Sequence, residues 1–453
     1  MPYIKNESQL LSHGHVELRR AVLEIIEYAL EQTNPYKSVQ KLVRKDGRQL
    51  AVDDLSFQLQ EGQRIFILGA GKATYPIARA LEDILGHWIT DGVVICKHGQ
   101  DGRLDRSRLY LAGHPIPDLP GYEAAVEALA LAQSTGPGDI VFACITGGSS
   151  ALMPYPAAGV SLEDKKAVNQ LLLTCGANIY EINAVRKHLS RIKGGRLALA
   201  MHPGTRLINL TVSDVTGDEL DYITDPTVPD TSWFDDARST LTKYGLWGKI
   251  PASVSTYLTG GDADEETPKQ ADLASRERHD FILIKGDEAC NAACRKATEM
   301  GLNAMVLSTQ FEGESRELGR NFAAIAKEII QNRRPLEIPC MIVGGGETTV
   351  TVDDKVGLGG PNQEFALAAA LEIEGLANIV IVGMDSDGTD GPTSLAGGMV
   401  DGLSASIARE KNVDLFSALK QHDVTPTLVS IGDGIETGNT GTNVNDLKLM
   451  LIR

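Results

Sequence analysis

Two glycine-containing segments carry residues suited to chemistry, because each could hold an anion such as a phosphate. One is Leu68-Gly69-Ala70-Gly71-Lys72-Ala73, and the other is Thr146-Gly147-Gly148-Ser149-Ser150-Ala151. Each follows an apolar run that predicts a buried strand. A strand that turns through glycines into a helix directs backbone N–H groups and the positive end of the helix dipole at one point. Together with Lys72, these segments indicate phosphoryl chemistry.

The first segment departs from two known nucleotide-binding motifs. A dinucleotide fingerprint would have a glycine where Thr74 stands and an acid at the end of the next strand, whereas Asp91 precedes that strand. A P-loop would have a glycine at Phe66 and a serine or threonine at Ala73. A tight turn beside a solvated lysine is therefore the alternative interpretation.

The second segment combines paired glycines with paired hydroxyls, which suits the oxygens of a phosphate. The same composition would suit an oxyanion hole beside a serine nucleophile. However, Gly148-Ser149-Ser150 lacks the Gly-x-Ser-x-Gly spacing of such a nucleophile. We therefore favour a phosphate cradle for this segment.

A basic cluster occupies residues 183–196 of a chain that is otherwise acidic. The chain has 43 Lys and Arg against 60 Asp and Glu, a formal net charge of -17. This balance argues against nucleic-acid binding, which needs surplus cations, so an anionic ligand must be held by local groups. The cluster could hold a carboxylate or a triphosphate. For Lys187 and Arg191, a solvated helix face is the preferred interpretation.

Three acidic segments complete the set of candidates. Asp214 follows the predicted strand 206–212, at the strand end where α/β folds bind ligands, and could serve as a base or a metal ligand. Residues 344–349 place Glu347 after three glycines. The alternative interpretation of this segment is a hairpin turn with no further role. Residues 385–391 resemble a calcium loop without its twelfth-position acid, so magnesium bound with a nucleotide fits better.

Apolar periodicity predicts strands that alternate with helices, which indicates parallel sheets covered by helices. In the first half we expect helices at 16–30, 73–85, 122–132, 162–175 and 179–199, and strands at 64–68, 93–96, 140–145 and 206–212. In the second half we expect helices at 288–300, 315–330 and 363–372, and strands at 281–284, 304–307, 340–343, 348–352, 379–382, 428–431 and 447–452. The fold class is therefore α/β, with two Rossmann-like α/β/α domains and a ligand cleft between them.

Length and composition are those of a two-domain globular protein. The 453 residues exceed the usual size of one core, and a polar stretch at 260–268 marks the boundary between domains at 1–265 and 280–453. No apolar stretch is long enough to cross a bilayer, and the first residues lack the core of a signal peptide. We therefore expect a cytoplasmic protein with no membrane partner. The six cysteines are expected to be reduced thiols, not zinc ligands.

Taken in order, these segments resemble the glycerate 2-kinase family, in which an N-terminal kinase domain precedes a C-terminal MOFRL domain. The most specific segments are Gly113-His114-Pro115-Ile116-Pro117-Asp118, 183–196, 213–218, 344–350, 387–391 and 440–446. The resemblance covers nearly the whole chain. It implies ATP-dependent phosphorylation of D-glycerate at its secondary hydroxyl. Members of the family have often been labelled hydroxypyruvate reductases, and NAD(P)H-dependent reduction is therefore the alternative activity.

The resemblance places two residues in the active site, and we assign the other roles from the needs of phosphoryl transfer. Lys72 and Asp214 match active-site residues, with Lys72 stabilising the transferred phosphoryl group and Asp214 orienting or deprotonating the acceptor. Arg186 is assigned to the substrate carboxylate. Candidate ligands of the ATP phosphates are Gly69, Gly71, Gly147, Gly148, Ser149, Ser150, Lys193, Glu347 and Asn362. Asp387 and Asp390 are the candidate ligands of Mg2+.

Four positions depart from the family pattern. Pro361 stands where many members have an arginine, and Asp225 replaces a glycine near a loop that could meet substrate. Ser149 and Asn439 replace a glycine and a proline. The expected partners remain ATP and a small hydroxy acid, with a homodimer among the oligomeric states left open. A catalytically inactive ligand-binding protein is a third interpretation.

Overall fold

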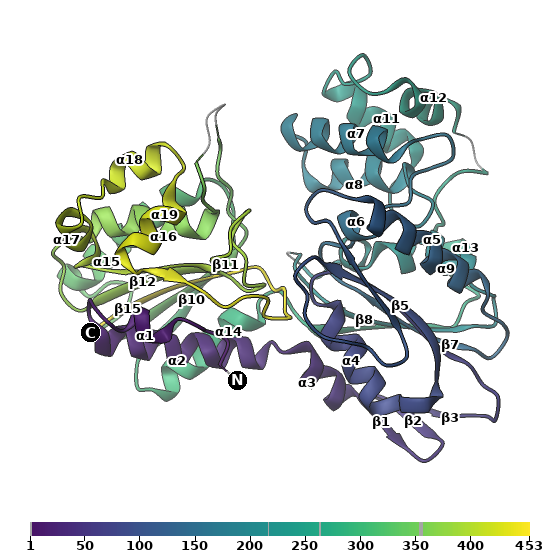
Figure 1. Cartoon of the computed structure of the whole chain (residues 1–453), viewed down its shortest axis with the longest axis horizontal. Helices are drawn as coiled ribbons and strands as arrows, with labels where there is room; N and C mark the ends of the chain where they lie inside the picture. The colour runs from purple at the N-terminus through teal and green to yellow at the C-terminus, as the bar shows by residue number, and fades with distance from the viewer. Residues whose placement is uncertain (1, 216, 262–263, 353–356) are drawn as a thin grey trace. The chain divides into compact units, whose positions relative to one another are not determined.

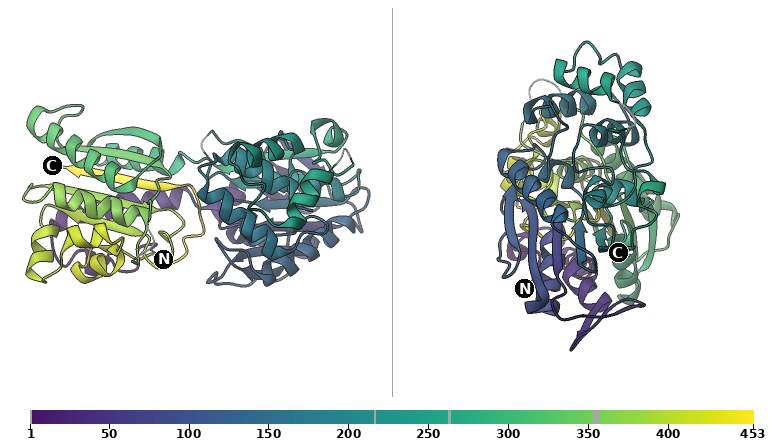
Figure 2. Two further views of the ribbon diagram at one scale, coloured as in Figure 1. Left: turned by 90° about the horizontal axis from the view of Figure 1, so that it is seen from above. Right: turned by 90° about the vertical axis from the view of Figure 1, so that its right-hand side faces the viewer.

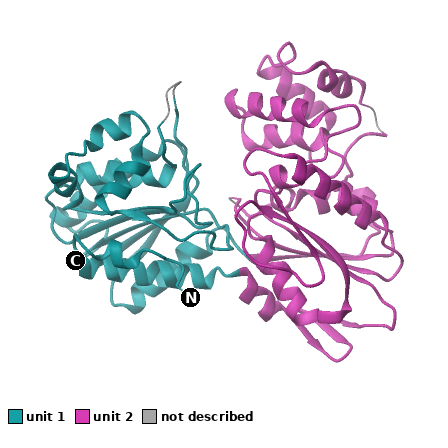
Figure 3. Cartoon of the chain, viewed as in Figure 1, with its two compact units in different colours: residues 1–34, 284–453 teal, residues 35–283 magenta. Residues whose placement is uncertain are grey.

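The computed structural model describes residues 2–215, 217–261, 264–352 and 357–453, which form two compact units. Unit 1 comprises residues 1–34 and 284–453, and unit 2 comprises residues 35–283 (Figure 3). Thr216 and parts of the predicted linker lie outside the described residues. Among the described residues, none of the helices combines the length and apolar character needed to cross a bilayer.

Unit 2 is built on a six-stranded sheet with the strand order β6-β5-β4-β7-β8-β9 (Figure 1). Its strands are β4 (Ile65–Ala70), β5 (Ile89–Lys97), β6 (Arg108–Ala112), β7 (Ile140–Ile145), β8 (Arg206–Val212) and β9 (Arg278–Ile284). Strand β4 pairs in parallel with both β5 and β7, and the pairs β5–β6 and β7–β8 are also parallel. The chain thus builds outward from β4 through β6, then returns to the other side of β4. Ligands of such sheets bind at this switch point, beyond the carboxyl ends of the central strands.

Helices cover both faces of this sheet, as predicted for the α/β class. Helix α4 (Thr74–Leu85) packs against β4 and β5, and α5 (Leu119–Gln133) covers the opposite face (Figure 1). The remaining short elements are α3 (Pro35–Leu42), α6 (Ser149–Leu152), α9 (Arg196–Ala200), α10 (Leu220–Ile223) and α13 (Gln270–Leu273), with 3-10 turns at Gly86–Trp88 and Asp225–Thr227.

A second apolar core in unit 2 belongs to a group of helices that the periodicity only partly predicts. The helices are α7 (Leu162–Thr174), α8 (Ile179–His188), α11 (Phe234–Lys243) and α12 (Ala252–Gly260). The predicted helix 179–199 is two helices: α8 ends at His188, and α9 begins after Gly194 and Gly195, which adopt positive φ. An antiparallel sheet of β1 (Val43–Asp46), β2 (Gln49–Val52) and β3 (Leu55–Gln58) was also not predicted.

Unit 1 contains a second six-stranded sheet, with the order β10-β11-β15-β12-β13-β14. Its strands are β10 (Asn303–Phe311), β11 (Cys340–Gly346), β12 (Ile379–Asp385), β13 (Gly397–Asp401), β14 (Gly434–Ile435) and β15 (Asp446–Ile452). Only β10 and β11 pair in parallel, and the four other pairs are antiparallel. This sheet is therefore mixed, unlike the parallel sheet that the alternating pattern predicts.

Both faces of the unit 1 sheet are covered, which explains the continuous apolar runs of its central strands. Helix α16 (Pro361–Glu372) packs on one face, and α2 (Val16–Gln32) with α14 (Glu288–Glu299) packs on the other (Figures 1 and 2). The other helices are α1 (Glu7–Leu10), α15 (Ser315–Asn332), α17 (Ser404–Glu410), α18 (Leu415–Lys420) and α19 (Val424–Ile431).

Two predicted strands of the second half are wrong. Residues 428–431 belong to helix α19, because a short apolar run does not distinguish a buried helix from a strand. Residues 348–352 form no strand, and Thr349 makes only an isolated bridge to Glu314.

The domain boundaries differ from the prediction at both ends. Residues 1–34 lie in unit 1, because α2 buries its apolar face against α14. Arg19 reinforces this attachment: its guanidinium is fully buried and lies 2.6 Å from Asp401 and 2.8 Å from Asp433. At the other boundary, residues 266–283 stay in unit 2, since β9 extends the sheet beyond β8.

Arg19→Met should loosen the attachment of α2 to unit 1. The substitution removes the ion-pair partner of Asp401 and one partner of Asp433, which also contacts His13, and breaking a buried ion pair costs about 3–5 kcal/mol. We expect the α2 amides to exchange hydrogen faster in the variant. Hydrogen exchange is the measurement of choice because all three tryptophans lie in unit 2, so tryptophan fluorescence does not report on α2. The exposed neighbour Arg20→Met is the control, and an equal effect of both substitutions would contradict the assigned role.

Candidate functional site

The two glycine segments lie side by side at the switch point of the unit 2 sheet. They follow β4 and β7, which are adjacent strands. The N–H of Lys72 donates to the carbonyl of Gly147 at 2.9 Å, and the N–H of Thr146 donates to Ala70 at 3.0 Å. The N–H of Ala73 donates to the hydroxyl of Thr146 at 3.2 Å. The segments therefore form one hydrogen-bonded body.

The glycines of the first segment are required by close packing. A Cβ on Gly71, whose φ is +144°, would lie 2.0 Å from the Thr146 hydroxyl oxygen. A Cβ on Gly69 would lie 2.5 Å from the methyl group of Thr74. The N–H of Gly71 donates to Ile95 at 3.1 Å, so the amides of residues 71–73 are all used inside the protein. These contacts give Gly69 and Gly71 a packing role in place of the predicted phosphate contact.

The second segment, unlike the first, has backbone amides that could bind an anion. Gly148 adopts φ +86°, and a Cβ there would lie 3.2 Å from Cγ of Lys72 and 3.1 Å from Nε2 of His114. Within the residues that the structure describes, the amides of Gly147 and Gly148 donate no hydrogen bond. Two amides, one ammonium-bearing side chain and one imidazole thus surround the same turn. Such a group of donors suits a phosphate oxygen.

His114 is a member of this group to which sequence reasoning gave no role. It lies in segment 113–118, whose last residue Asp118 caps helix α5 by accepting the N–H of Gly121 at 3.0 Å. The signal in the sequence was the segment itself, among those that carry the family resemblance. Its place near Lys72 required the fold.

Asp214 follows β8, the strand next to β7. The hydroxyl of Thr211, in β8, donates to the carbonyl of Ile145 at 2.6 Å, so the ends of β7 and β8 are held together. The side chain of Asp214 is half-buried. Lys72, residues 147–150 and Asp214 therefore follow three adjacent strands at the carboxyl edge of one sheet. This edge is where the sequence predicts them to meet ligand.

The basic cluster is buried in part: Lys187 and Lys193 are buried, whereas Arg191 is exposed. The prediction of a solvated face is wrong for Lys187, whose ammonium lies 2.5 Å from Asp221 and 3.1 Å from Asp230, with 1% of the side chain exposed. Although burial alone would lower it, Asp230 and Asp221 raise the pKa of Lys187. Arg191 is exposed, as predicted, and its guanidinium lies over the Tyr155 ring.

Lys193 also forms a buried ion pair, with Asp225 at 2.8 Å. Burial lowers the pKa of Lys193 despite the attraction of that carboxylate. Arg186 is partly exposed and donates to the side-chain oxygen of Asn169 at 3.3 Å. Of the two predicted anion ligands in this segment, Arg186 is accordingly the better exposed, whereas Lys193 already has a carboxylate partner.

Lys165 is a further buried cation, which sequence reasoning missed. Its ammonium donates to the carbonyl of Leu189 at 2.8 Å, at the end of helix α8. Burial, with repulsion from Lys193 and Arg186, lowers the pKa of Lys165 to about 7. Local sequence gives no signal of this, since the residue stands in an ordinary amphipathic helix.

In unit 1, the acidic loop after β12 accepts hydrogen bonds from the first residues of helix α16. The carboxylate of Asp390 accepts the N–H groups of Asn362 and Gln363 at 3.0 and 2.9 Å, and their side-chain amides at 3.2 and 3.0 Å. These bonds occupy its lone pairs. Burial raises the pKa of Asp390 to about 6. Its contacts assign Asp390 to the helix and not to the predicted magnesium ion.

Asn362 is likewise committed to the interior. Its amide donates to Asp446 at 2.7 Å as well as to Asp390, and its oxygen accepts from Lys448 at 3.0 Å. The predicted contact of Asn362 with ATP is therefore not favoured. Pro361 occupies the first position of α16, where a helix needs no N–H donor.

The other predicted residues of unit 1 leave the magnesium site incomplete. One oxygen of Asp387 accepts from the N–H and hydroxyl of Thr389 at 2.8 and 2.6 Å, and Glu347 is exposed after β11. Among the described residues, no three His, Cys, Asp or Glu side chains gather as a metal site would require. Because the predicted Mg2+ ion is one bound jointly with a nucleotide, Asp387 stays a prediction as its ligand.

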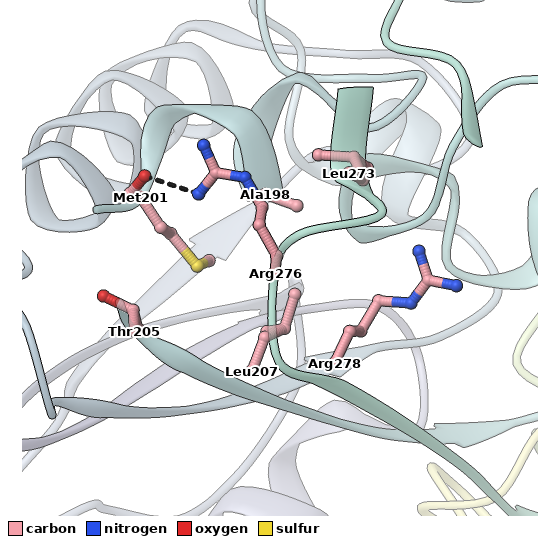
Figure 4. Close-up of a pocket in the computed structure, with 7 residues that line it drawn as sticks. All are labelled: Ala198, Met201, Thr205, Leu207, Leu273, Arg276 and Arg278. Atoms are coloured by element: carbon pink, nitrogen blue, oxygen red, sulfur yellow. Dashed lines mark hydrogen bonds between the residues drawn. The ribbon is translucent and has the colours of Figure 1, made fainter. Parts of the chain in front are cut away.

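A cavity beside β8 can be set aside as a ligand site. Arg276 crosses it and donates to the carbonyl of Met201 at 2.7 Å (Figure 4). Its volume is about 10 Å³, room for no more than a water molecule.

Comparison with known proteins identifies relatives along nearly the whole chain. A family model described as a domain of unknown function, DUF4147, matches residues 21–259, and the MOFRL family matches residues 340–446. The glycerate 2-kinase of Pyrococcus horikoshii is 41% identical over 440 residues, which are 96% of this chain and 98% of that protein. A putative hydroxypyruvate reductase of Agrobacterium vitis is 39% identical and covers 86% of this chain and 99% of its own.

A solved structure is also similar over nearly the whole chain. The crystal structure of a glycerate kinase from Thermotoga maritima is 37% identical, with a TM-score of 0.80, and the match covers 96% of this chain and 100% of that one.

Gly71→Ala should separate the two glycine segments. The methyl group meets Thr146 at a distance no Cβ tolerates, so we expect a loss of about 1–3 kcal/mol or more in the free energy of unfolding. Urea unfolding followed by tryptophan fluorescence measures it, since the tryptophans lie in unit 2. Gly248→Ala, with no atom within 4 Å of the added carbon, should be close to wild type. Equal losses would contradict the packing role.

Lys165→Met should change how stability depends on pH. The pKa of Lys165 is about 7 in the folded protein, against an ordinary value of 10.5, so between these pH values the unfolded chain binds a proton that the folded chain lacks. Wild-type stability therefore rises with pH in this window. Between pH 7.5 and pH 9, the free energy of unfolding of wild type should therefore increase by about 2 kcal/mol more than that of Lys165→Met. Lys166→Met, at the surface beside Glu163, should show no such trend in the same urea titrations.

Proposed function

Because the chain belongs to the glycerate 2-kinase family, we propose that it transfers the terminal phosphoryl group of ATP to the 2-hydroxyl of D-glycerate, giving 2-phosphoglycerate. The observation that carries this proposal is the set of Lys72, Gly147, Gly148 and Asp214 on three adjacent strands at one sheet edge. Phosphoryl transfer needs positioning and charge neutralisation more than covalent chemistry, which such a set supplies.

In the proposed reaction, each group has one task. The carboxylate of Asp214 accepts the proton of the 2-hydroxyl as that oxygen forms its bond to the γ-phosphorus. The bond between the γ-phosphorus and the bridging oxygen breaks, and ADP leaves with those electrons. Lys72 neutralises charge on the transferred group, while the amides of Gly147 and Gly148 and the hydroxyls of Ser149 and Ser150 bind phosphate oxygens. Arg186 binds the substrate carboxylate.

Unit 1 enters the proposal less directly. Asp387 and Glu347 remain predictions, as does the cleft expected between the domains. Since Asp390 and Asn362 are occupied at the start of α16, no step is assigned to a resident metal ion.

The reductase alternative has support from the Rossmann-type strand order and from the name of the Agrobacterium vitis relative. The dinucleotide fingerprint is nevertheless incomplete in this fold. Strand β5 ends at Lys97, not at the acid that would bind a ribose. Thr74 occupies the third glycine position, and its hydroxyl donates to the carbonyl of Cys144 at 2.8 Å. We therefore favour the kinase.

Asp214→Asn should fold normally and lose phosphoryl transfer. Removing a group that acts on the reacting atoms typically costs about 10²–10⁴ in rate. Release of ADP in the presence of ATP and D-glycerate measures the rate, and product analysis checks for 2-phosphoglycerate. Asp235→Asn, an exposed carboxylate of α11, is the charge-matched control and should keep wild-type activity.

Two outcomes would contradict the proposal. One is substantial activity in Asp214→Asn. The other is oxidation of NADH by the wild-type protein with hydroxypyruvate, in the absence of ADP release from ATP and glycerate. The second outcome would favour the reductase.

A further inference from the structure

The buried ionic groups of unit 2 carry an inference about which acids the enzyme accepts. We call the seven side chains the Asp225 cluster: Lys165, Arg186, Lys187, Lys193, Asp221, Asp225 and Asp230. We propose that Asp225 sets the charge of the anion bound by this cluster, so that it takes a small acid with one carboxylate and discriminates against dianions. This proposal rests on the proposed function, since it places the substrate carboxylate at Arg186.

The charges of the cluster do not balance. Within these seven side chains four cations face three carboxylates, and Arg196 also acts on Asp230, so positive charge is in excess when every group is ionised. Lys187 is compensated by two of the carboxylates, Asp221 and Asp230. Asp225 is therefore the one carboxylate left for Lys165, Arg186 and Lys193.

Asp225 is placed to act on all three. Its Oδ2 lies 2.8 Å from the Lys193 ammonium, and its charge also acts on Arg186 and Lys165. Its Oδ1 is buried and has no hydrogen-bond partner among the described residues. Arg186 forms no ion pair with any carboxylate in the part of the chain that the structure describes. A guanidinium in that state is ready to bind a carboxylate with two hydrogen bonds.

An unbalanced charge in the interior is costly, so the cluster must give up a proton or bind an anion. The lowered pKa of Lys165 shows the first response: near pH 7 its proton is only partly held. A bound monocarboxylate supplies negative charge that the cluster lacks. The second charge of a dianion would lie near the Asp225 carboxylate, whose repulsion would cost affinity.

The cluster is also connected to the phosphate-binding segment. The N–H of Arg191 donates to the carbonyl of Tyr155 at 2.9 Å, and the N–H of Ala157 donates to Leu189 at 3.2 Å. Residues 155–157 follow closely on the Gly147–Ser150 turn. The residues that closely follow Arg186 are thus hydrogen-bonded to residues that follow the proposed phosphate site.

The test compares two acids that differ in one group. D-glycerate carries one carboxylate, and tartronate has a second carboxylate in place of the hydroxymethyl group. Titration calorimetry measures the affinity of each for the full chain without requiring turnover. Wild type should bind glycerate at least 10-fold more tightly than tartronate. Asp225→Asn should lower that ratio at least 10-fold, chiefly by tighter binding of tartronate.

Two further variants separate local charge from other causes. Asp225→Glu retains the charge but changes the length of the side chain, and it should keep the wild-type preference for glycerate. If the shape of the side chain mattered and its charge did not, this variant would lose the preference. Asp235→Asn removes a charge from the surface of the same unit and should leave the ratio unchanged. If Asp225→Asn does not fold, the wild-type ratio still decides, because equal affinity for the two acids would overturn the proposal.

The outcome is distinguishable from failure of the proposed function. Glycerate turnover with a ratio that Asp225→Asn leaves unchanged would overturn only the role of Asp225. Absence of phosphoryl transfer to either acid, with the charge preference intact, would overturn only the kinase. Calorimetric binding of neither acid would contradict the placement of a carboxylate at Arg186.

Discussion

The contact between the ends of β4 and β7 is the constraint on which the candidate site depends. Backbone hydrogen bonds join residues 70–73 to residues 146–147, and the approach leaves no room for a side chain at Gly71. Because the amides of the first turn are used in this contact, the amides of the second turn are the ones that the proposed function assigns to a ligand. A glycine-rich turn can thus serve a phosphate site by allowing two loops to meet, without touching the phosphate itself.

The parts of this site that follow from local patterns could be predicted from the sequence. Continuous apolar runs located β4, β7 and β8, and the residues after them therefore fell at one sheet edge. The direction of pairing was less accessible. Strands β12 and β15 are apolar throughout because both faces are covered, and such runs are the same in parallel and antiparallel sheets.

Long-range polar contacts could not be predicted, because their partners have no fixed spacing. Asp390 accepts from residues 27 and 28 positions earlier, so its resemblance to a metal ligand was the only local signal. Lys187 has partners 34 and 43 positions later, and nothing in segment 183–196 distinguishes a buried cation from a solvated one. The attachment of α2 to unit 1 similarly depends on Asp401 and Asp433, nearly the whole chain away.

The free-energy cost of burying polar groups explains two of the buried polar clusters that the structure describes, and it distinguishes them. At the start of α16, Asp390 and Asn362 are saturated by hydrogen bonds, which suits a rigid support for the loops of unit 1. Around Asp225, by contrast, the described residues leave one carboxylate oxygen without a hydrogen-bond partner and the Arg186 guanidinium without a carboxylate. A saturated network gains nothing from a ligand, whereas an unsaturated one does. Of the two, the Asp225 cluster is therefore the place where binding energy for a small anion is available.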